Sequence, residues 1–289
     1  MKKNNILKTI LSIVASFCYI LLIGTGAGVV NALGAITANG KTANGNYLKP
    51  TYASEVCNAT EPISKPKLAI VIDDFGEDRR GVEEMLNINA RLTIAVMPAD
   101  EFSIEDAEKA HSKGHEVILH MPMENETYAP ANYYGPVLIK NSYSPDEARK
   151  VLAECIDKTP HCKGVNIHMG TGVSKNKPII TELMKEVKSR DMFFLDSKTV
   201  MGSVCPECAK EVGAKFYDRD VFLEPPGRPN YARAVSELYN AVKVAQEKGK
   251  AVAIGHIGPV GTTETARAIA DNLEKILAMG IEIVPLSEL

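Results

Sequence analysis

The chain has 289 residues, of which 45% are hydrophobic and 24% are charged, so it can bury one large core or two small ones. Its formal net charge of −3 comes with neither the basic surplus nor the basic stripe of a polyanion-binding protein, which argues against nucleic acid as a partner. Tryptophan is absent, and this argues against a dedicated carbohydrate-binding module more strongly than against an enzyme.

Residues 1–32 have the layout of an export signal. Lys2, Lys3 and Lys8 precede an almost uncharged stretch at residues 9–30, which matches a positive region followed by an apolar region. This stretch of about 22 residues is also long enough to span a bilayer core, so an uncleaved membrane anchor is the alternative. In both cases we expect an exported protein whose remaining chain lies in the periplasm or another extracytoplasmic space.

Residues 33–66 are rich in Ala, Gly, Asn, Thr, Ser and Pro and show no sustained periodicity, which is typical of a flexible linker. From residue 67 to residue 289, short apolar runs alternate with longer segments of helical period. The apolar runs cover residues 68–72, 92–97, 116–119, 164–167, 192–195, 214–217, 251–254 and 281–284. Clear helices between them cover residues 144–157, 178–189, 231–248 and 263–279.

These runs predict the fold class. Strands that are apolar on both faces and are separated by helices indicate a buried parallel sheet. Several of the helical segments end at a glycine, as helices commonly do, for example at Gly213 and Gly249. Seven or eight such units favour an α/β barrel, and a doubly wound open sheet is the alternative.

Acidic and histidine side chains stand where the apolar runs end. Asp73 and Asp74 follow the first run, and later runs end at His120, His168, Asp196 and His256. Because the carboxyl ends of parallel barrel strands converge on one mouth, we expect these side chains to share a site. Taken singly, each also has an ordinary explanation, since an Asp after a strand can cap the next helix and a His can be a hydrogen-bonded core residue.

Four of the six cysteines form two close pairs within the predicted domain, Cys155 with Cys162 and Cys205 with Cys208. Disulfides are one interpretation, because exported proteins meet an oxidising compartment. A structural metal held by the thiolates is the second, and four unpaired thiols are the third.

Several segments resemble one enzyme family. Ile72-Asp73-Asp74-Phe75-Gly76 resembles the opening motif of the polysaccharide deacetylases, in which the first Asp is a base and the second binds metal. The divergent polysaccharide deacetylase branch is resembled by further segments in the same order: Gly114-His115-Glu116 through His120, Val165-Asn166-Ile167-His168-Met169-Gly170, Phe194-Leu195-Asp196-Ser197, Asp220-Val221-Phe222-Leu223 and Ile254-Gly255-His256. The resemblance covers residues 67–289 and implies a distorted (β/α) barrel of seven or eight units.

The resemblance also implies a divalent metal, most of all zinc. Asp74 and His120 match ligand positions of the family, and His168 is the expected third ligand. Standard members carry a second His where this chain has Glu124, so Glu124 is the alternative ligand. Carboxylate and imidazole groups both suit zinc, whose catalytic sites keep three protein ligands and an open position.

The catalytic roles follow from the same resemblance. Asp73 matches the base and His256 the acid, and Asp196 is expected to orient a catalytic His. The Arg-containing third motif of standard members is not recognisable. Side chains expected to contact substrate are Asn166, Tyr133 and Tyr134.

The sequence thus predicts an exported metal-dependent hydrolase that removes N-acetyl or similar acyl groups from an acetylated polysaccharide or oligosaccharide of the envelope. One alternative is a catalytically inactive deacetylase-like protein that binds glycan or a protein partner. Another is a metal-dependent hydrolase of other amides or esters.

Overall fold

The computed structural model describes residues 65–127, 134–224 and 230–289. The expected export signal or anchor at residues 1–32, the expected linker up to residue 64, and Tyr133 lie outside the described residues. Among the described residues, no helix combines the length and the apolar character needed to cross a membrane.

The order of elements is a repeated alternation of strand and helix. The strands are β1 (Lys67–Phe75), β2 (Thr93–Val96), β3 (Glu116–Met123), β4 (Cys162–Met169), β5 (Phe193–Asp196), β6 (Lys215–Asp218), β7 (Val221–Phe222), β8 (Lys250–His256) and β9 (Glu282–Ile283). The helices are α2 (Val82–Leu86), α3 (Ser103–Ser112), α4 (Pro145–Lys158), α5 (Lys177–Ser189), α6 (Cys205–Val212), α7 (Tyr231–Lys248) and α8 (Gly258–Ala278), with 3-10 turns η2 (Val173–Lys175) and η3 (Leu286–Glu288). Each of the eight predicted runs overlaps a strand, and β7 is additional.

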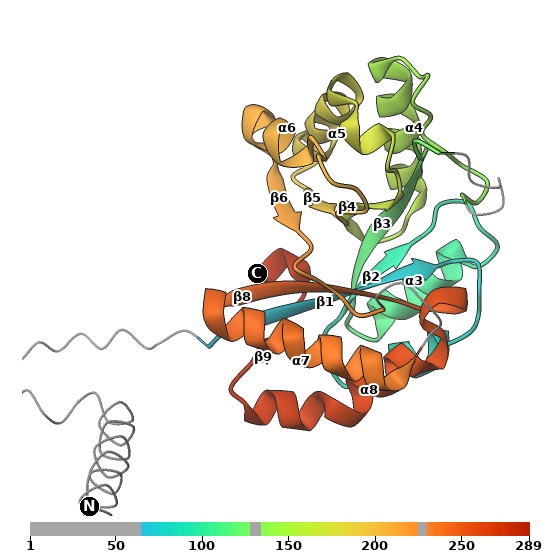
Figure 1. Ribbon diagram of the computed structural model, residues 1–289. Helices are drawn as coiled ribbons and strands as arrows, with labels where there is room; N and C mark the ends of the chain where they lie inside the picture. Colours follow the sequence, from blue (N-terminus) through green and yellow to red (C-terminus); the bar gives the residue numbers. More distant parts are fainter. Residues whose placement is uncertain (1–64, 128–133, 225–229) are drawn as a thin grey trace, which may run out of the picture. The chain divides into compact units, whose positions relative to one another are not determined.

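All the strands pair in parallel and form one curled sheet in the order β6-β5-β4-β3-β2-β1-β8-β7, with β9 beside β1. Helices α4, α5 and α6 cover the β3–β6 half, and α7 and α8 cover the half that contains β1 and β8 (Figure 1). The end strands β6 and β7 are separated by only two residues in the chain, but no pairing joins them in the described part of it. The α/β barrel expectation is therefore confirmed, with an open seam between β6 and β7.

Alternation along the strands decides what fills the barrel. In β1, Leu68, Ile70 and Ile72 pack against the helices, whereas Ala69 and Val71 face the interior. The interior apolar cluster is completed by Ala95, Ile118, Phe193, Leu195, Val252, Ile254 and, from η3, Leu286.

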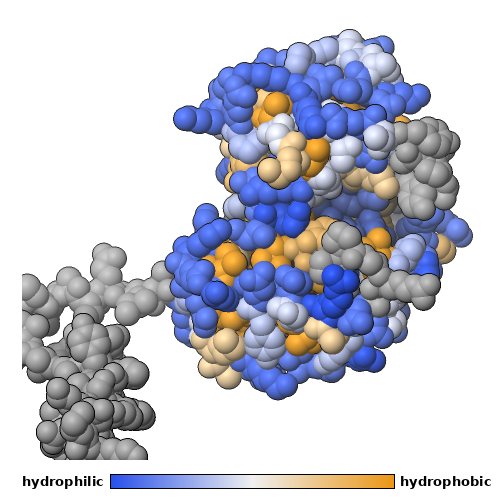
Figure 2. All heavy atoms as spheres, in the orientation of Figure 1, coloured by the Kyte–Doolittle hydropathy of each residue, from blue (hydrophilic) through white to orange (hydrophobic). Residues whose placement is uncertain are grey.

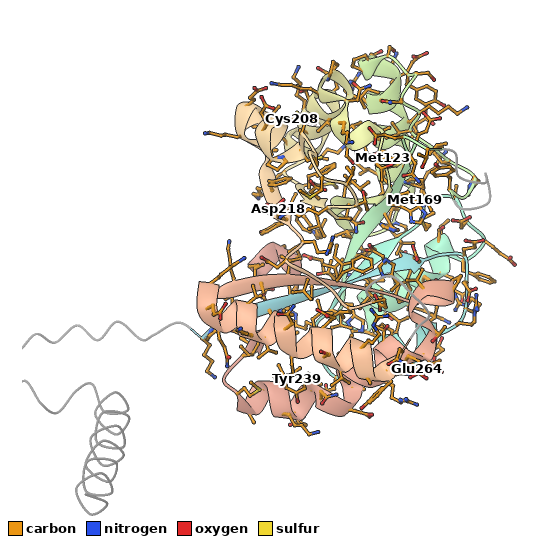
Figure 3. All side chains as sticks on the ribbon, viewed as in Figure 1. Met123, Met169, Cys208, Asp218, Tyr239 and Glu264 are labelled. Carbon is orange, nitrogen blue, oxygen red and sulfur yellow. The ribbon has the colours of Figure 1, made fainter. Side chains whose placement is uncertain are left out.

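The inward face turns polar toward the carboxyl ends of the strands. Asp73, His120 and His256 each follow an inward-facing apolar residue of β1, β3 or β8 by two positions, so they lie on the same inner face. All three are buried. The barrel thus has an apolar floor and a polar mouth. Met123 and Met169, the last residues of β3 and β4, are register partners at this end (Figure 3).

The four cysteines of the domain are free thiols, which corrects the expectation of disulfides, and the one group of converging metal-ligating side chains among the described residues contains no cysteine. Cys155, Cys205 and Cys208 lie buried in the apolar cluster between the sheet and helices α4–α6, and Cys162 packs against its edge. Burial raises the pKa of Cys155 and Cys162 to about 11, so these groups behave as small hydrophobic side chains.

Candidate active site

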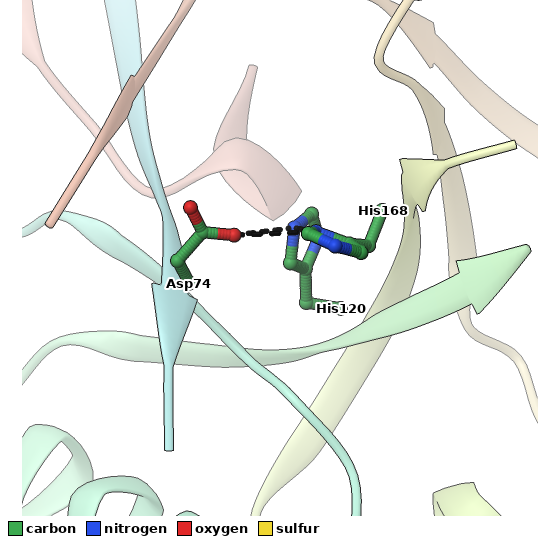
Figure 4. A group of neighbouring side chains, drawn as sticks. All are labelled: Asp74, His120 and His168. Carbon is green, nitrogen blue, oxygen red and sulfur yellow. Dashed lines mark hydrogen bonds and ion pairs between the residues drawn. The ribbon is translucent and has the colours of Figure 1, made fainter. Parts of the chain in front are cut away.

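The carboxyl ends of β1, β3 and β4 bring together the three side chains predicted as metal ligands, Asp74, His120 and His168 (Figure 4). The Oδ1 atom of Asp74 lies 3.3 Å from His120 Nε2 and 3.2 Å from His168 Nδ1, and these two nitrogens are 3.0 Å apart. Three potential ligand atoms thus converge at one point of the mouth.

An irregularity in β1 allows two consecutive carboxylates to reach the same place. In a regular strand Asp73 and Asp74 would point to opposite faces, yet both lie near His120 Nε2, at 3.8 Å and 3.3 Å. The register of β1 with β2 shifts between Ile72 and Phe75, and Asp74 adopts a φ of 70°, in the left-handed region. Such strained backbone is found most often where function requires a particular side-chain direction.

The surroundings of Asp74 fit a cation. Its buried Oδ1 has no hydrogen-bond partner by geometry within the described chain, although two imidazole nitrogens lie 3.2 and 3.3 Å from it. Although burial raises the pKa of Asp74, His120 and His168 hold it well below its usual range, so the carboxylate is ionised. A buried carboxylate oxygen without a donor, facing two imidazole nitrogens, is a donor set that suits zinc.

Asn166 on β4 orients both His120 and Asp73. Its Nδ2 donates to Asp73 Oδ1 at 2.7 Å, so its Oδ1 is left to accept the Nδ1 proton of His120 at 2.8 Å. With Nδ1 protonated, Nε2 of His120 presents its lone pair to the ligand cluster. Asn166 was expected to contact substrate, but the structure uses its amide to hold two site residues, and it is fully buried.

Asp73 lies between the ligand cluster and His256. Its Oδ1 is occupied by Asn166, while its Oδ2 lies 3.8 Å from His120 Nε2 and 3.9 Å from His256 Nε2. Burial raises the pKa of Asp73, against the opposing effect of the two histidines.

His256, the last residue of β8, is held by Glu224. The Glu224 carboxylate accepts from His256 Nδ1 at 3.0 Å and from the His256 backbone N–H at 3.1 Å, and it also accepts a hydrogen bond from the hydroxyl of Thr265. Burial by itself lowers the pKa of His256, but the hydrogen bond to Glu224 and the charges of Asp74, Glu224 and Asp73 raise it to about 9. His256 is therefore an imidazolium at neutral pH, with Nε2 directed toward Asp73.

The carboxylate that orients His256 is thus Glu224 and not the expected Asp196. Asp196 is the in-register neighbour of Asp218 and follows the outward-facing Phe194 by two positions, so it lies on the helix side of β5. There its Oδ1 accepts the backbone N–H of Lys198 at 2.8 Å. Glu224 directly follows the segment Asp220–Leu223, and its place after an apolar strand was the signal available in the sequence.

Two other expected residues lie outside the cluster. The carboxylate of Glu124 accepts the backbone N–H of Asn141 at 2.7 Å and is not part of the group of converging ligands. Tyr134 is buried, with its hydroxyl accepting the backbone N–H of Asn125 at 3.2 Å, which indicates a packing role in its loop.

The surface is hollowed between the half built on β3–β6 and the half built on β1, β2 and β8, and hydrophilic residues lie along this hollow (Figure 2). The mouth residues come from both halves, since Asp74 and His256 lie at the carboxyl ends of β1 and β8 whereas His120 and His168 lie in the carboxyl-terminal halves of β3 and β4. A ligand lying in the hollow would therefore meet groups from both halves.

The model of the divergent polysaccharide deacetylase family matches residues 70–289. The chain is 31% identical to the uncharacterized protein YibQ of Escherichia coli (strain K12) over 204 residues, which cover 69% of this chain and 61% of that protein. It is 28% identical over 200 residues to an uncharacterized protein of Haemophilus influenzae, with 68% of each chain covered. The chain thus spans about three fifths of its Escherichia coli relative.

Among solved structures, the uncharacterized protein ATU2773 from Agrobacterium tumefaciens C58 superposes with a TM-score of 0.71 at 22% sequence identity. The superposition covers 78% of this chain and 89% of that chain. This likeness shows that the two proteins share the fold.

Proposed function

The chain belongs to the divergent polysaccharide deacetylase family, and from that premise we propose that it is an exported, metal-dependent hydrolase that removes N-acetyl or similar acyl groups from an envelope polysaccharide. One observation carries this proposal. The candidate ligands Asp74, His120 and His168 adjoin a buried carboxylate, Asp73, which lies 3.9 Å from the imidazolium of His256. A protein that only binds glycan does not require such a pair of proton-transfer groups beside the ligands.

Asp74, His120 and His168 would hold the metal, and their two nitrogens and one oxygen favour zinc. When bound, zinc polarises an acyl carbonyl and lowers the pKa of a water molecule to about 7. The remaining steps are proton transfers by side chains of this chain.

Asp73 supplies the base. Its Oδ1 is held by Asn166, so Oδ2 is the atom left to accept the proton of the attacking water. Burial raises the pKa of this carboxyl, which makes it a stronger base than a solvent-exposed aspartate.

His256 supplies the acid. Glu224 fixes its Nδ1, so its Nε2 is the nitrogen that faces the reacting groups and can give a proton to the departing amine. A pKa of about 9 keeps it protonated at neutral pH, and general-acid catalysis of this kind contributes about 10²–10⁴-fold in rate.

The test compares two neighbouring carboxylates. Asp73→Asn should abolish acetate release from acetylated glycan oligomers but keep about one zinc per chain, whereas Asp74→Ala should lose both. Zinc content is measured by elemental analysis and acetate by a coupled assay. Asp196→Asn is the control, because this residue lies on the helix side of the sheet and should leave both readouts unchanged.

Full activity in Asp73→Asn would show that another group is the base. If the parent protein holds zinc but releases no acetate from any acetylated glycan, the proposal of a glycan deacetylase is overturned in favour of a glycan-binding protein.

A further inference from the structure

Arg219 bridges the open seam of the barrel. It belongs to the two-residue link between β6 and β7, the strands at opposite ends of the sheet order. On the β5 side its Nε donates to the Ser197 carbonyl at 2.7 Å and its Nη2 to the Lys198 carbonyl at 3.0 Å. On the β7 side its guanidinium stacks over the ring of Phe222, with 4.8 Å between the guanidinium carbon and the ring centroid.

The charge of Arg219 is not balanced by a carboxylate of the described chain. Its two anchoring bonds go to neutral carbonyls, and no Asp or Glu oxygen among the described residues lies within 4.0 Å of its nitrogens. Burial lowers the pKa of Arg219, while the more distant charges of Asp196 and Asp73 raise it.

Partial burial removes water from a cation, and the free-energy cost of this desolvation is offset only when an anion pairs with the cation. The Nη1 group of Arg219 makes no hydrogen bond within the described chain, so it keeps its donors available for such an anion. The stack on Phe222 and the two carbonyl contacts hold the planar fork in one orientation, which reduces the entropy lost on binding.

Arg219 lies near His256, the proposed general acid. The Phe222 ring that carries Arg219 also contacts His256, with 4.8 Å between ring centroids. The Phe222 ring thus links Arg219 to His256, and the charge of Asp73 acts on Arg219, so the guanidinium lies near the candidate active site.

We propose that Arg219 binds a carboxylate of the substrate, so that the preferred glycan carries an acidic sugar beside the acylated amino sugar. This inference rests on the proposed function of the site. A planar guanidinium matches a carboxylate with two parallel hydrogen bonds. Among the carboxylates near the mouth, Asp74 faces the two histidines and Glu224 contacts His256, so Arg219 is the cation that remains without a carboxylate partner in the described chain.

The experiment measures binding rather than turnover. Zinc-loaded Asp73→Asn protein is titrated in a calorimeter with an oligosaccharide of alternating N-acetylglucosamine and glucuronic acid, and with its neutral methyl ester. We expect the acid form to bind about tenfold more tightly, as a charge-assisted pair typically provides. Adding Arg219→Met should remove this preference while leaving affinity for the ester unchanged, and Arg219→Lys should retain part of it.

Arg267→Met is the matched control, because Arg267 also stacks on an aromatic ring, that of Tyr231 at 4.4 Å, but lies on α8. It should leave the preference intact. Equal binding of acid and ester by the parent protein, or a preference that survives Arg219→Met, would overturn the role of Arg219 alone. Failure of both oligosaccharides to bind would overturn the proposed glycan function together with this inference.

Discussion

At the scale of single residues, His256 is flanked by two carboxylates that act differently on it. Glu224 contacts Nδ1 and the backbone N–H, so it fixes the orientation of the ring and stabilises the imidazolium. Asp73 Oδ2 lies 3.9 Å from Nε2 and makes no hydrogen bond to it, so this oxygen is left to accept the proton of the attacking water. The division of roles follows from which ring nitrogen each carboxylate meets.

Glu224→Gln tests this division. The charge of Glu224 helps raise the pKa of His256 from 6.5 to about 9, so the parent enzyme should lose its acid only as the pH rises through about 9. Without that charge the pKa of His256 falls, and the alkaline limb of the kcat/KM profile should move to lower pH. Loss of an orienting partner should also lower activity about 10–100-fold.

The measurement is the pH profile of acetate release for both proteins across neutral and alkaline pH. Glu264→Gln serves as the control, because Glu264 is on the same helix as Thr265 but pairs with Arg267. An alkaline limb that stays in place in Glu224→Gln would show that Glu224 does not set the protonation of His256.

At the scale of elements, the junction between β8 and α8 fixes where His256 stands. Helix α8 begins two residues after His256 and is kinked at Thr262, whose φ is 49°. A Cβ at Gly261 would lie 1.8 Å from the carbonyl oxygen of His256, so the first turn can approach the strand end only because residue 261 is glycine. This close approach holds the strand end that carries the acid.

Gly261→Ala should therefore destabilise the protein by at least about 3 kcal/mol, because backbone must move to admit the methyl group. Gly249→Ala is the matched control: its added Cβ meets open space, and only its φ of 81° disfavours alanine, at a cost of about 1 kcal/mol. Urea unfolding of both variants gives the two free energies. Equal losses would mean that the turn relaxes without cost.

At the scale of the whole molecule, the candidate metal centre joins the two halves of the barrel. Asp74 belongs to the half with β1 and β8, and the two histidines to the half with β3 and β4, with helices of each half forming separate apolar clusters. A metal bound by all three side chains would link these halves directly and stabilise the folded state over the unfolded chain.

Zinc should accordingly raise the thermal unfolding midpoint, with about 4 kcal/mol of stabilisation at a free concentration 1,000 times the dissociation constant. His168→Ala should abolish most of this effect. His161→Ala should not, because His161 pairs with Glu108 away from the mouth. Scanning calorimetry with zinc and with chelator measures it, and stabilisation that persists in His168→Ala would place the metal elsewhere.

The sequence alone determined the order of strands and helices and the positions where chemistry collects. Apolar runs separated by helical segments predicted the strands at the right places, and Gly213 and Gly249 end α6 and α7 in the left-handed conformation. The strand-end positions of Asp74, His120 and His168 also followed, since carboxyl ends of parallel strands must meet at one edge.

Only the tertiary structure decided which strand-end side chains face one another. Strands that are apolar on both faces carry no signal for their inner face, so Asp196 looked equivalent to the site residues but lies on the helix side. The contacts of Glu224 with His256 and of Asn166 with Asp73 join residues 32 and 93 positions apart. Such contacts depend on how the sheet curls, and curvature is a property of the packed barrel and not of any single segment.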